Sequence, residues 1–135
     1  MLTFTDTTVA NGARFSYSVA AIGPFGEGPR SATVVAQRAV APGTPTSFTA
    51  TTAAGKTGIA LNWKAPSSDG GSPVTGYRIY RGTVSGGESF LVGVAATTTS
   101  FTDASVGHKI RYYYRVTATN AVGEGASAAA NVTSR

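Results

Sequence analysis

The chain repeats itself at an offset of 97 residues, and this repeat limits what it can fold into more than any other feature. Residues 3–37 align with residues 100–134 without a gap, and thirteen aligned pairs are identical, among them Asp6 with Asp103. A unit of about 100 residues, built from short alternating strands, fits a seven-stranded sandwich better than a solenoid, whose repeats are much shorter. The sequence therefore predicts one complete sandwich, preceded by the C-terminal part of another.

The composition favours the all-β class. Charged residues make up only 13% of the 135 residues, and Gly, Ser, Thr and Ala outnumber the residues that favour helices. Because the chain has no cysteine, a packed core rather than disulfide bonds must stabilise it. We expect three segments: a sandwich fragment with strands E, F and G at residues 1–38, a Pro-containing linker at residues 39–45, and a complete sandwich at residues 46–135.

Alternating residues predict which face each strand of the complete copy buries. Residues 58–64 place apolar side chains and Trp63 on one side and polar or small ones on the other. Residues 74–81 and 111–118 alternate in the same way, and residues 90–94 form a further alternating set of Phe90, Val92 and Val94. The residues expected in the core are Trp63, Tyr77, Tyr112, Tyr114 and Val116.

Several segments of this copy together resemble the fibronectin type III family: Trp63, the Gly-Tyr-Arg-Ile-Tyr run at residues 76–80, residues 112–120, and the Gly-Glu-Gly turn at residues 123–125. The resemblance implies an immunoglobulin-like, seven-stranded sandwich in which the Tyr112 hydroxyl bonds the backbone near the turn before its strand. The partial copy departs from the pattern there, because Phe15 has no hydroxyl. Members of this family usually stand in arrays on extracellular proteins, in bacteria beside secreted carbohydrate-degrading enzymes.

Few residues suit catalysis or metal binding. The chain has one histidine, His108, in an expected turn, and its six acidic residues include two pairs that recur at the repeat offset. A recurring position more often serves the fold than a single active site. The remaining acids, Asp69 and Glu88, lie in or beside Gly/Ser turns without a partner, and these turns lack the pattern of a phosphate-binding loop. We therefore predict no enzyme, with no catalytic, cofactor-binding or metal-ligating residues.

One face of the complete copy interleaves cations with aromatic rings. Residues expected to point outward from two neighbouring strands form this Arg/Tyr face: Arg78, Tyr80, Arg111, Tyr113 and Arg115. It is interpreted either as a platform for a sugar chain, an acidic polymer or a protein, or as cross-strand packing that covers an exposed sheet. The net charge of +5 is scattered along the chain, so a nucleic acid is not an expected partner. No apolar stretch approaches the roughly 20 residues that a spanning helix needs, so a membrane is not expected either.

These observations predict a non-catalytic spacer or interaction module of a larger multidomain bacterial protein, secreted or on the cell surface, with the neighbouring domains of the same polypeptide as partners. The alternative is a ligand-binding module that holds polysaccharide, acidic polymer or protein, as an accessory to a glycoside hydrolase. Its binding surface is then the Arg/Tyr face, or the B–C loop at residues 66–73 and the F–G loop at residues 120–125. In the partial copy, Phe15, Tyr17 and Val19 have almost nothing opposite them. We expect that segment to be mobile, or to self-associate through its apolar face and free edge.

Overall fold

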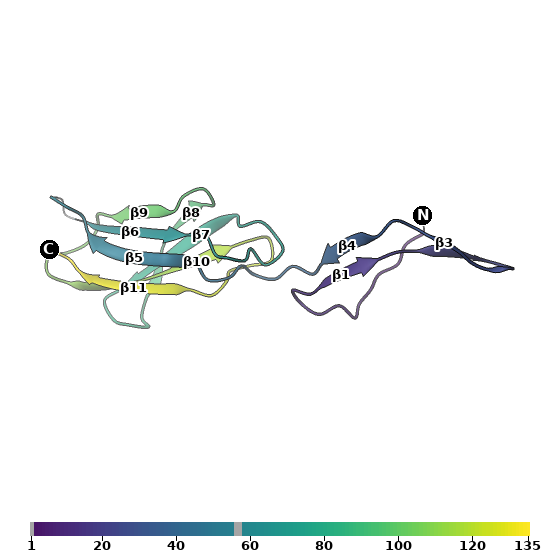
Figure 1. Ribbon diagram of the computed structural model, residues 1–135. Coiled ribbons are helices and arrows are strands. Elements are labelled where there is room, and N and C mark those ends of the chain that lie inside the picture. Colours follow the sequence, from purple (N-terminus) through teal and green to yellow (C-terminus); the bar gives the residue numbers. More distant parts are fainter. Residues whose placement is uncertain (1, 56–57) are drawn as a thin grey trace.

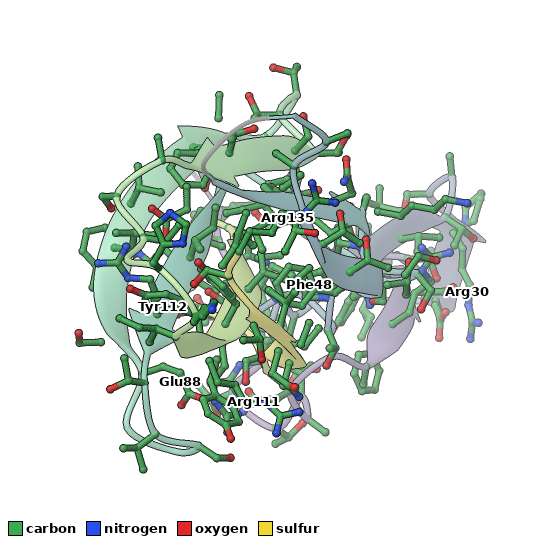
Figure 2. All side chains as sticks on the ribbon, turned by 90° about the vertical axis from the view of Figure 1, so that its left-hand side faces the viewer. Arg30, Phe48, Glu88, Arg111, Tyr112 and Arg135 are labelled. Carbon is green, nitrogen blue, oxygen red and sulfur yellow. The ribbon has the colours of Figure 1, made fainter. Side chains whose placement is uncertain are left out.

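The computed structural model describes residues 2–55 and 58–135. The molecule is elongated, with a two-layer β-sandwich at the C-terminal end and a narrow twisted ribbon at the other (Figure 1). Every regular element in the described ranges is a strand, and the strands form a four-stranded, a three-stranded and two two-stranded sheets. The expected all-β sandwich fold is confirmed. The same ranges contain no helix long and apolar enough to cross a bilayer.

Seven strands form the sandwich in two antiparallel sheets, in the orders β5-β6-β9 and β11-β10-β7-β8. The first sheet consists of β5 (Thr46–Thr52), β6 (Ile59–Lys64) and β9 (Ser100–Asp103). The second consists of β7 (Gly76–Gly82), β8 (Ser89–Ala95), β10 (Arg111–Thr119) and β11 (Ala128–Thr133). Strand β10 lies between β7 and β11. One of its faces therefore contributes side chains to the core, and the other contributes side chains to the outer surface of this sheet.

The core is formed by every second side chain along strands that face each other across the two sheets. On β6 the residues Ile59, Leu61 and Trp63 are buried, and their neighbours are more exposed. The Trp63 and Tyr77 rings meet edge to face with centroids 5.6 Å apart, which joins the two sheets. Tyr112, Tyr114 and Val116, expected to face inward, are buried in the same cluster.

Strand β8 departs from the simple alternation expected for Phe90, Val92 and Val94. Its pairing with β7 shifts between Ile79↔Val92 and Tyr80↔Phe90, which leaves Leu91 as an extra residue. This bulge turns Phe90 outward, where its ring packs edge to face against Tyr80, while Leu91 and Val92 both pack on the core. A bulge of one residue reverses the side of everything beyond it.

The N-terminal ribbon is a hairpin, residues 14–37, in which β1 (Arg14–Tyr17) pairs with β4 (Val34–Gln37) and β2 (Ala20–Gly23) pairs with β3 (Gly26–Arg30). Between the two paired stretches, Val19 and Ser31 are joined by two hydrogen bonds. Residues 2–13 lie outside any strand, so strand E of the expected fragment is not formed. The repeat gives the reason, because the equivalent strand β9 pairs with β6, and the hairpin has no counterpart of β6 among the described residues.

Candidate functional site

The register of β7 and β10 brings part of the Arg/Tyr face together. Tyr80 lies opposite Arg115, and Arg78 lies opposite Thr117, on the outer side of the four-stranded sheet. Tyr113 lies opposite Gly82 of β7. Arg111, at the far end of β10, lies opposite Thr133 of β11. The face therefore divides into a central group around Tyr80 and Arg115 and a separate pair, Arg111 and Tyr113.

Two glutamates complete the central group. The Arg115 guanidinium donates to Glu88 Oε2 at 3.1 Å, and the Glu88 side chain is 4% exposed. Glu124 Oε1 accepts hydrogen bonds from the hydroxyls of Tyr80 and Thr117, and Arg78 lies 3.5 Å from its Oε2. Sequence reasoning placed Glu88 in a turn without a partner and read the recurrence of Glu124 as support for the fold. No local pattern could have found these pairs, since they depend on how the β7–β8 and β10–β11 connections fold back.

Hydrogen bonds keep both carboxylates ionised. Donation from Thr117 and Tyr80 holds the pKa of Glu124 below its usual range, against the effect of burial. A hydrogen bond from its own backbone N–H, helped by Arg115, likewise lowers the pKa of Glu88. The two negative charges therefore balance those of Arg78 and Arg115 at neutral pH. The remaining opening is a pocket of about 290 Å³ lined by groups of both signs.

A second polar cluster lies inside the sandwich. The buried Asp103 carboxylate accepts hydrogen bonds from Arg81 at 2.8 Å, from the Tyr114 hydroxyl at 2.9 Å, and from the backbone and hydroxyl of Ser105. Burial alone would raise the pKa of Asp103, but these donors outweigh it, and the pKa lies below its usual range. Burial and the hydrogen bond to Asp103 raise the pKa of Tyr114. Asp103 is thus a fully bonded structural carboxylate with no free oxygen to act as a base.

The other residues singled out in the sequence are Tyr112, His108 and Asp69. The Tyr112 hydroxyl accepts a hydrogen bond from the Gly107 N–H at 2.9 Å, and the Arg81 guanidinium lies over its ring. His108 is an exposed turn residue. Asp69 accepts a hydrogen bond from the Gly71 N–H within its own loop. In residues 2–55 and 58–135, His, Cys, Asp and Glu side chains form no group of three able to hold a metal ion.

The most distinctive polar site joins the expected linker to two loops of the sandwich. The buried Asn120 side-chain amide donates to the carbonyls of Val40 and Asp69 at 2.7 and 2.8 Å. Its oxygen accepts hydrogen bonds from the Val122 and Gly123 N–H groups, which closes the turn between β10 and β11. One side chain thus bonds the linker and both loops at this end of the sandwich. We call this arrangement the linker contact.

The backbone reinforces the linker contact. The Val40 N–H donates to the Gly70 carbonyl at 2.8 Å, and the Gly43 N–H donates to the Ser68 carbonyl at 2.9 Å. Gly70 has a φ of +77°, and a Cβ there would overlap the Val40 carbonyl; one at Gly125 would overlap the Pro42 carbonyl. Only glycine lets these loops approach so closely. Sequence reasoning took Gly70 as a turn residue and missed Asn120, because its partners lie 51 to 80 residues away.

Comparison with known proteins agrees with this geometry. The sequence model described as "Fibronectin type III domain" matches residues 43–135, more than half of the chain. The chain belongs to the fibronectin type III domain family. The matched residues include the whole sandwich and the part of the linker that follows Pro42, so the Arg/Tyr face, the buried Asp103 cluster and most of the linker contact lie within one fibronectin type III module.

Two curated relatives place such modules in long polypeptides. An Exoglucanase B from Cellulomonas fimi is 34% identical over 144 residues, which cover 99% of this chain and 12% of that protein. An Amylopullulanase from Thermoanaerobacterium saccharolyticum is 36% identical over 87 residues, 64% of this chain and 6% of that protein. The chain therefore spans only a small part of each relative. It is similar to modules within larger multidomain enzymes.

Solved structures give the same fold. An Fn3-like protein from Clostridium thermocellum is 29% identical, with a TM-score of 0.58, and the match covers 68% of this chain and 92% of that one. A crystal structure of consecutive titin domains is 25% identical, with a TM-score of 0.62, covering 93% of this chain and 42% of that one. The titin match thus extends beyond the fibronectin type III module of this chain into its N-terminal hairpin.

Proposed function

We propose that this chain is a non-catalytic spacer and interaction module that sets the distance and orientation of neighbouring domains in a larger bacterial protein. The linker contact is the observation that carries this proposal. A flexible linker leaves its domains free to reorient, whereas here the buried Asn120 amide bonds Val40 directly. Residues that enter the module are thereby held against its B–C and F–G loops. Such a junction transmits a fixed direction along the chain.

The glycines at this junction support the same role. Gly70 and Gly125 bring two loops to within contact of the linker backbone, at positions where any side chain would push the linker away. Gln37, the last residue of the hairpin, also lies close to the B–C loop: a Cβ at Gly71 would lie 3.1 Å from its side-chain amide carbon. Close packing on both sides of the linker is what a rigid spacer requires.

We further propose the division of the chain into a module fragment at residues 1–38, a linker at residues 39–45 and a complete module at residues 46–135. The repeat at an offset of 97 residues supports it. The relatives support a setting outside the cell, because an exoglucanase and an amylopullulanase act on polysaccharides too large to enter it. The neighbouring domains of the same polypeptide are then the first partners of this module.

Distance measurements between two spin labels test the spacer function. The chain has no cysteine, so Ala36→Cys at the end of the hairpin and Ser85→Cys in the β7–β8 turn can be labelled selectively; both sites are exposed. We expect a single narrow distance distribution, which Asn120→Ala broadens. Asn131→Ala, the same change at an exposed position of β11, is the control and leaves the distribution unchanged. An equally broad distribution in all three proteins would refute the spacer function.

A second candidate function is the binding of a neutral polysaccharide at the outer pocket. The pocket of about 290 Å³ is lined by Tyr80, Arg115 and the two carboxylates of Glu88 and Glu124. The ion pairs of these glutamates with Arg115 and Arg78 balance its charges. Balanced charge favours an uncharged sugar over an acidic polymer. Titration with soluble glucans at low and high salt tests this: binding that persists at high salt and is lost in Tyr80→Ala supports it. Binding of acidic polymers alone, abolished by salt, would contradict it.

A further inference from the structure

The two copies of the repeat allow the same residues to be compared in two environments. Val116 on β10 is fully buried, whereas its equivalent Val19 in the hairpin is 72% exposed. Tyr114 is likewise buried, and its equivalent Tyr17 is not. The difference does not lie in the side chains, because both pairs are identical. It lies in what surrounds them.

The polar cluster around Asp103 also occurs in the N-terminal copy, but one of its members has no counterpart there. Asp6 accepts hydrogen bonds from the backbone and hydroxyl of Thr8 and, through Oδ2, from the Tyr17 hydroxyl at 3.1 Å. Ser105 and Tyr114 make the same bonds to Asp103, whose Oδ2 additionally accepts a hydrogen bond from Arg81 at 2.8 Å. Among the described residues, Asp6 has no such arginine.

In the complete module, the arginine that Asp6 lacks is supplied by a β-strand. Arg81 belongs to β7 and lies opposite Tyr114, while Ile79 and Tyr77 lie opposite Val116 and Ala118. In the hairpin the edge of β1 and β2 that corresponds to this side of β10 is unpaired within residues 2–55 and 58–135. We call it the vacant edge. A pocket of about 560 Å³ beside it is lined by Phe4, Asp6, Tyr17 and Val19.

We infer that the vacant edge is a binding site for an antiparallel β-strand with the pattern Tyr-x-Ile-x-Arg, whose arginine pairs with Asp6. Such a strand would cover Ala21, Val19 and Tyr17 as β7 covers Ala118, Val116 and Tyr114. Strand addition satisfies the free backbone groups of an edge and buries alternate side chains. The arginine adds a charge-assisted hydrogen bond to Asp6 Oδ2, which also accepts from Tyr17, just as Arg81 and Tyr114 share Oδ2 of Asp103. The occupant is a segment with the chemistry of residues 43–97, which contains β5 to β8.

A chain extended at its N-terminus provides the test. At the repeat offset of 97, residue 1 is equivalent to residue 98. A second copy of residues 43–97, fused directly before residue 1 of the full chain, therefore supplies its strands in the correct register. Amide hydrogen exchange of residues 15–21 is compared between the extended and unextended chains. We expect exchange to slow by about 100-fold or more in the extended chain, since a paired strand must open before it exchanges. Equally fast exchange in both chains would overturn the inference.

Two substitutions test the arginine itself. Arg81→Ala in the duplicated segment and Asp6→Asn should each accelerate exchange of residues 15–21 by about tenfold, and the double variant should exchange little faster than either, because residues in contact are not additive. Lys64→Ala in the duplicated segment, which removes an exposed charge, is the matched control and has no effect. Fully additive effects of the two substitutions would refute the pairing.

The same question can be asked of the unextended chain with a peptide of residues 73–83. We expect its addition to shift the amide resonances of residues 15–21, and the Arg81→Ala peptide to bind at least about tenfold more weakly, the loss of one hydrogen bond to a charged group. Protection that instead rises with chain concentration, and that neither peptide changes, would assign the vacant edge to a second copy of the chain. That outcome would overturn the inference.

Discussion

Asp103→Asn should be among the most damaging single changes in the module. The carboxylate accepts four hydrogen bonds, and its Oδ2 accepts from both Arg81 and Tyr114. Asparagine puts an amide group where one oxygen stood, which leaves the Arg81 guanidinium, only 25% exposed, without its carboxylate. Breaking a buried pair costs about 3–5 kcal/mol, and the partial exposure of Arg81 moves the expectation to the lower end, about 3 kcal/mol.

The lowered pKa of Asp103 also predicts how the free energy of unfolding changes with pH. The pKa of Asp103 is lower in the folded chain than in the unfolded one, so its contribution is complete above the unfolded pKa of about 3.9 and is lost as the pH falls through the folded pKa. Denaturant unfolding from pH 7 down to pH 2.5 measures the effect. The free energy of unfolding of Asp103→Asn should fall less steeply below about pH 4 than that of the wild type.

Asp69→Asn is the matched control for this series, because the Asp69 side chain is exposed and accepts its hydrogen bond from Gly71 within its own loop. It should keep the stability of the wild type at pH 7. The reasoning fails if Asp103→Asn changes the free energy of unfolding at pH 7 by less than about 1 kcal/mol, the size of one ordinary hydrogen bond. It also fails if the wild type and Asp103→Asn lose stability in parallel as the pH falls.

Three further changes have defined outcomes in denaturant melts. Trp63→Ala should cost about 3–5 kcal/mol, as aromatic truncations in cores do; a native Trp63 fluorescence maximum typical of full exposure would contradict it. Tyr112→Phe should cost about 1 kcal/mol, because it removes the acceptor of the Gly107 N–H; unchanged midpoints would contradict that role. Gly125→Ala should cost about 1–3 kcal/mol through collision with the Pro42 carbonyl; an unaltered exchange rate at the Gly43 amide would show that the linker had not moved.

The sandwich itself was predictable because its signals are local. Ile59, Leu61 and Trp63 alternate with less buried residues along one strand, and burial on β6 follows that alternation. The bulge at Leu91 was not predictable, since the alternation of Phe90, Val92 and Val94 indicates a regular strand. Only the pairing with β7 reveals the extra residue.

The site was less accessible to sequence reasoning than the fold. The face residues Arg78, Tyr80 and Arg115 could be placed on one side of two strands, yet their pairing with Glu88 and Glu124 depends on how distant turns return to the sheet. Asn120 belongs to the family-like segment 112–120 and to a turn, but nothing in the sequence indicated its contact with the linker. Its role arises from carbonyls of the linker and the B–C loop, which the folded chain brings together.

The order parameter of the Val40 amide from ¹⁵N relaxation tests most directly whether the linker is part of a rigid spacer. The Val40 N–H donates to Gly70 and its carbonyl accepts from Asn120, so both sides of this residue are held. We predict a value near 0.85, which is typical of rigid backbone, falling below about 0.6 in Asn120→Ala. A value below about 0.6 in the wild-type chain would show a flexible linker and contradict the proposed spacer function.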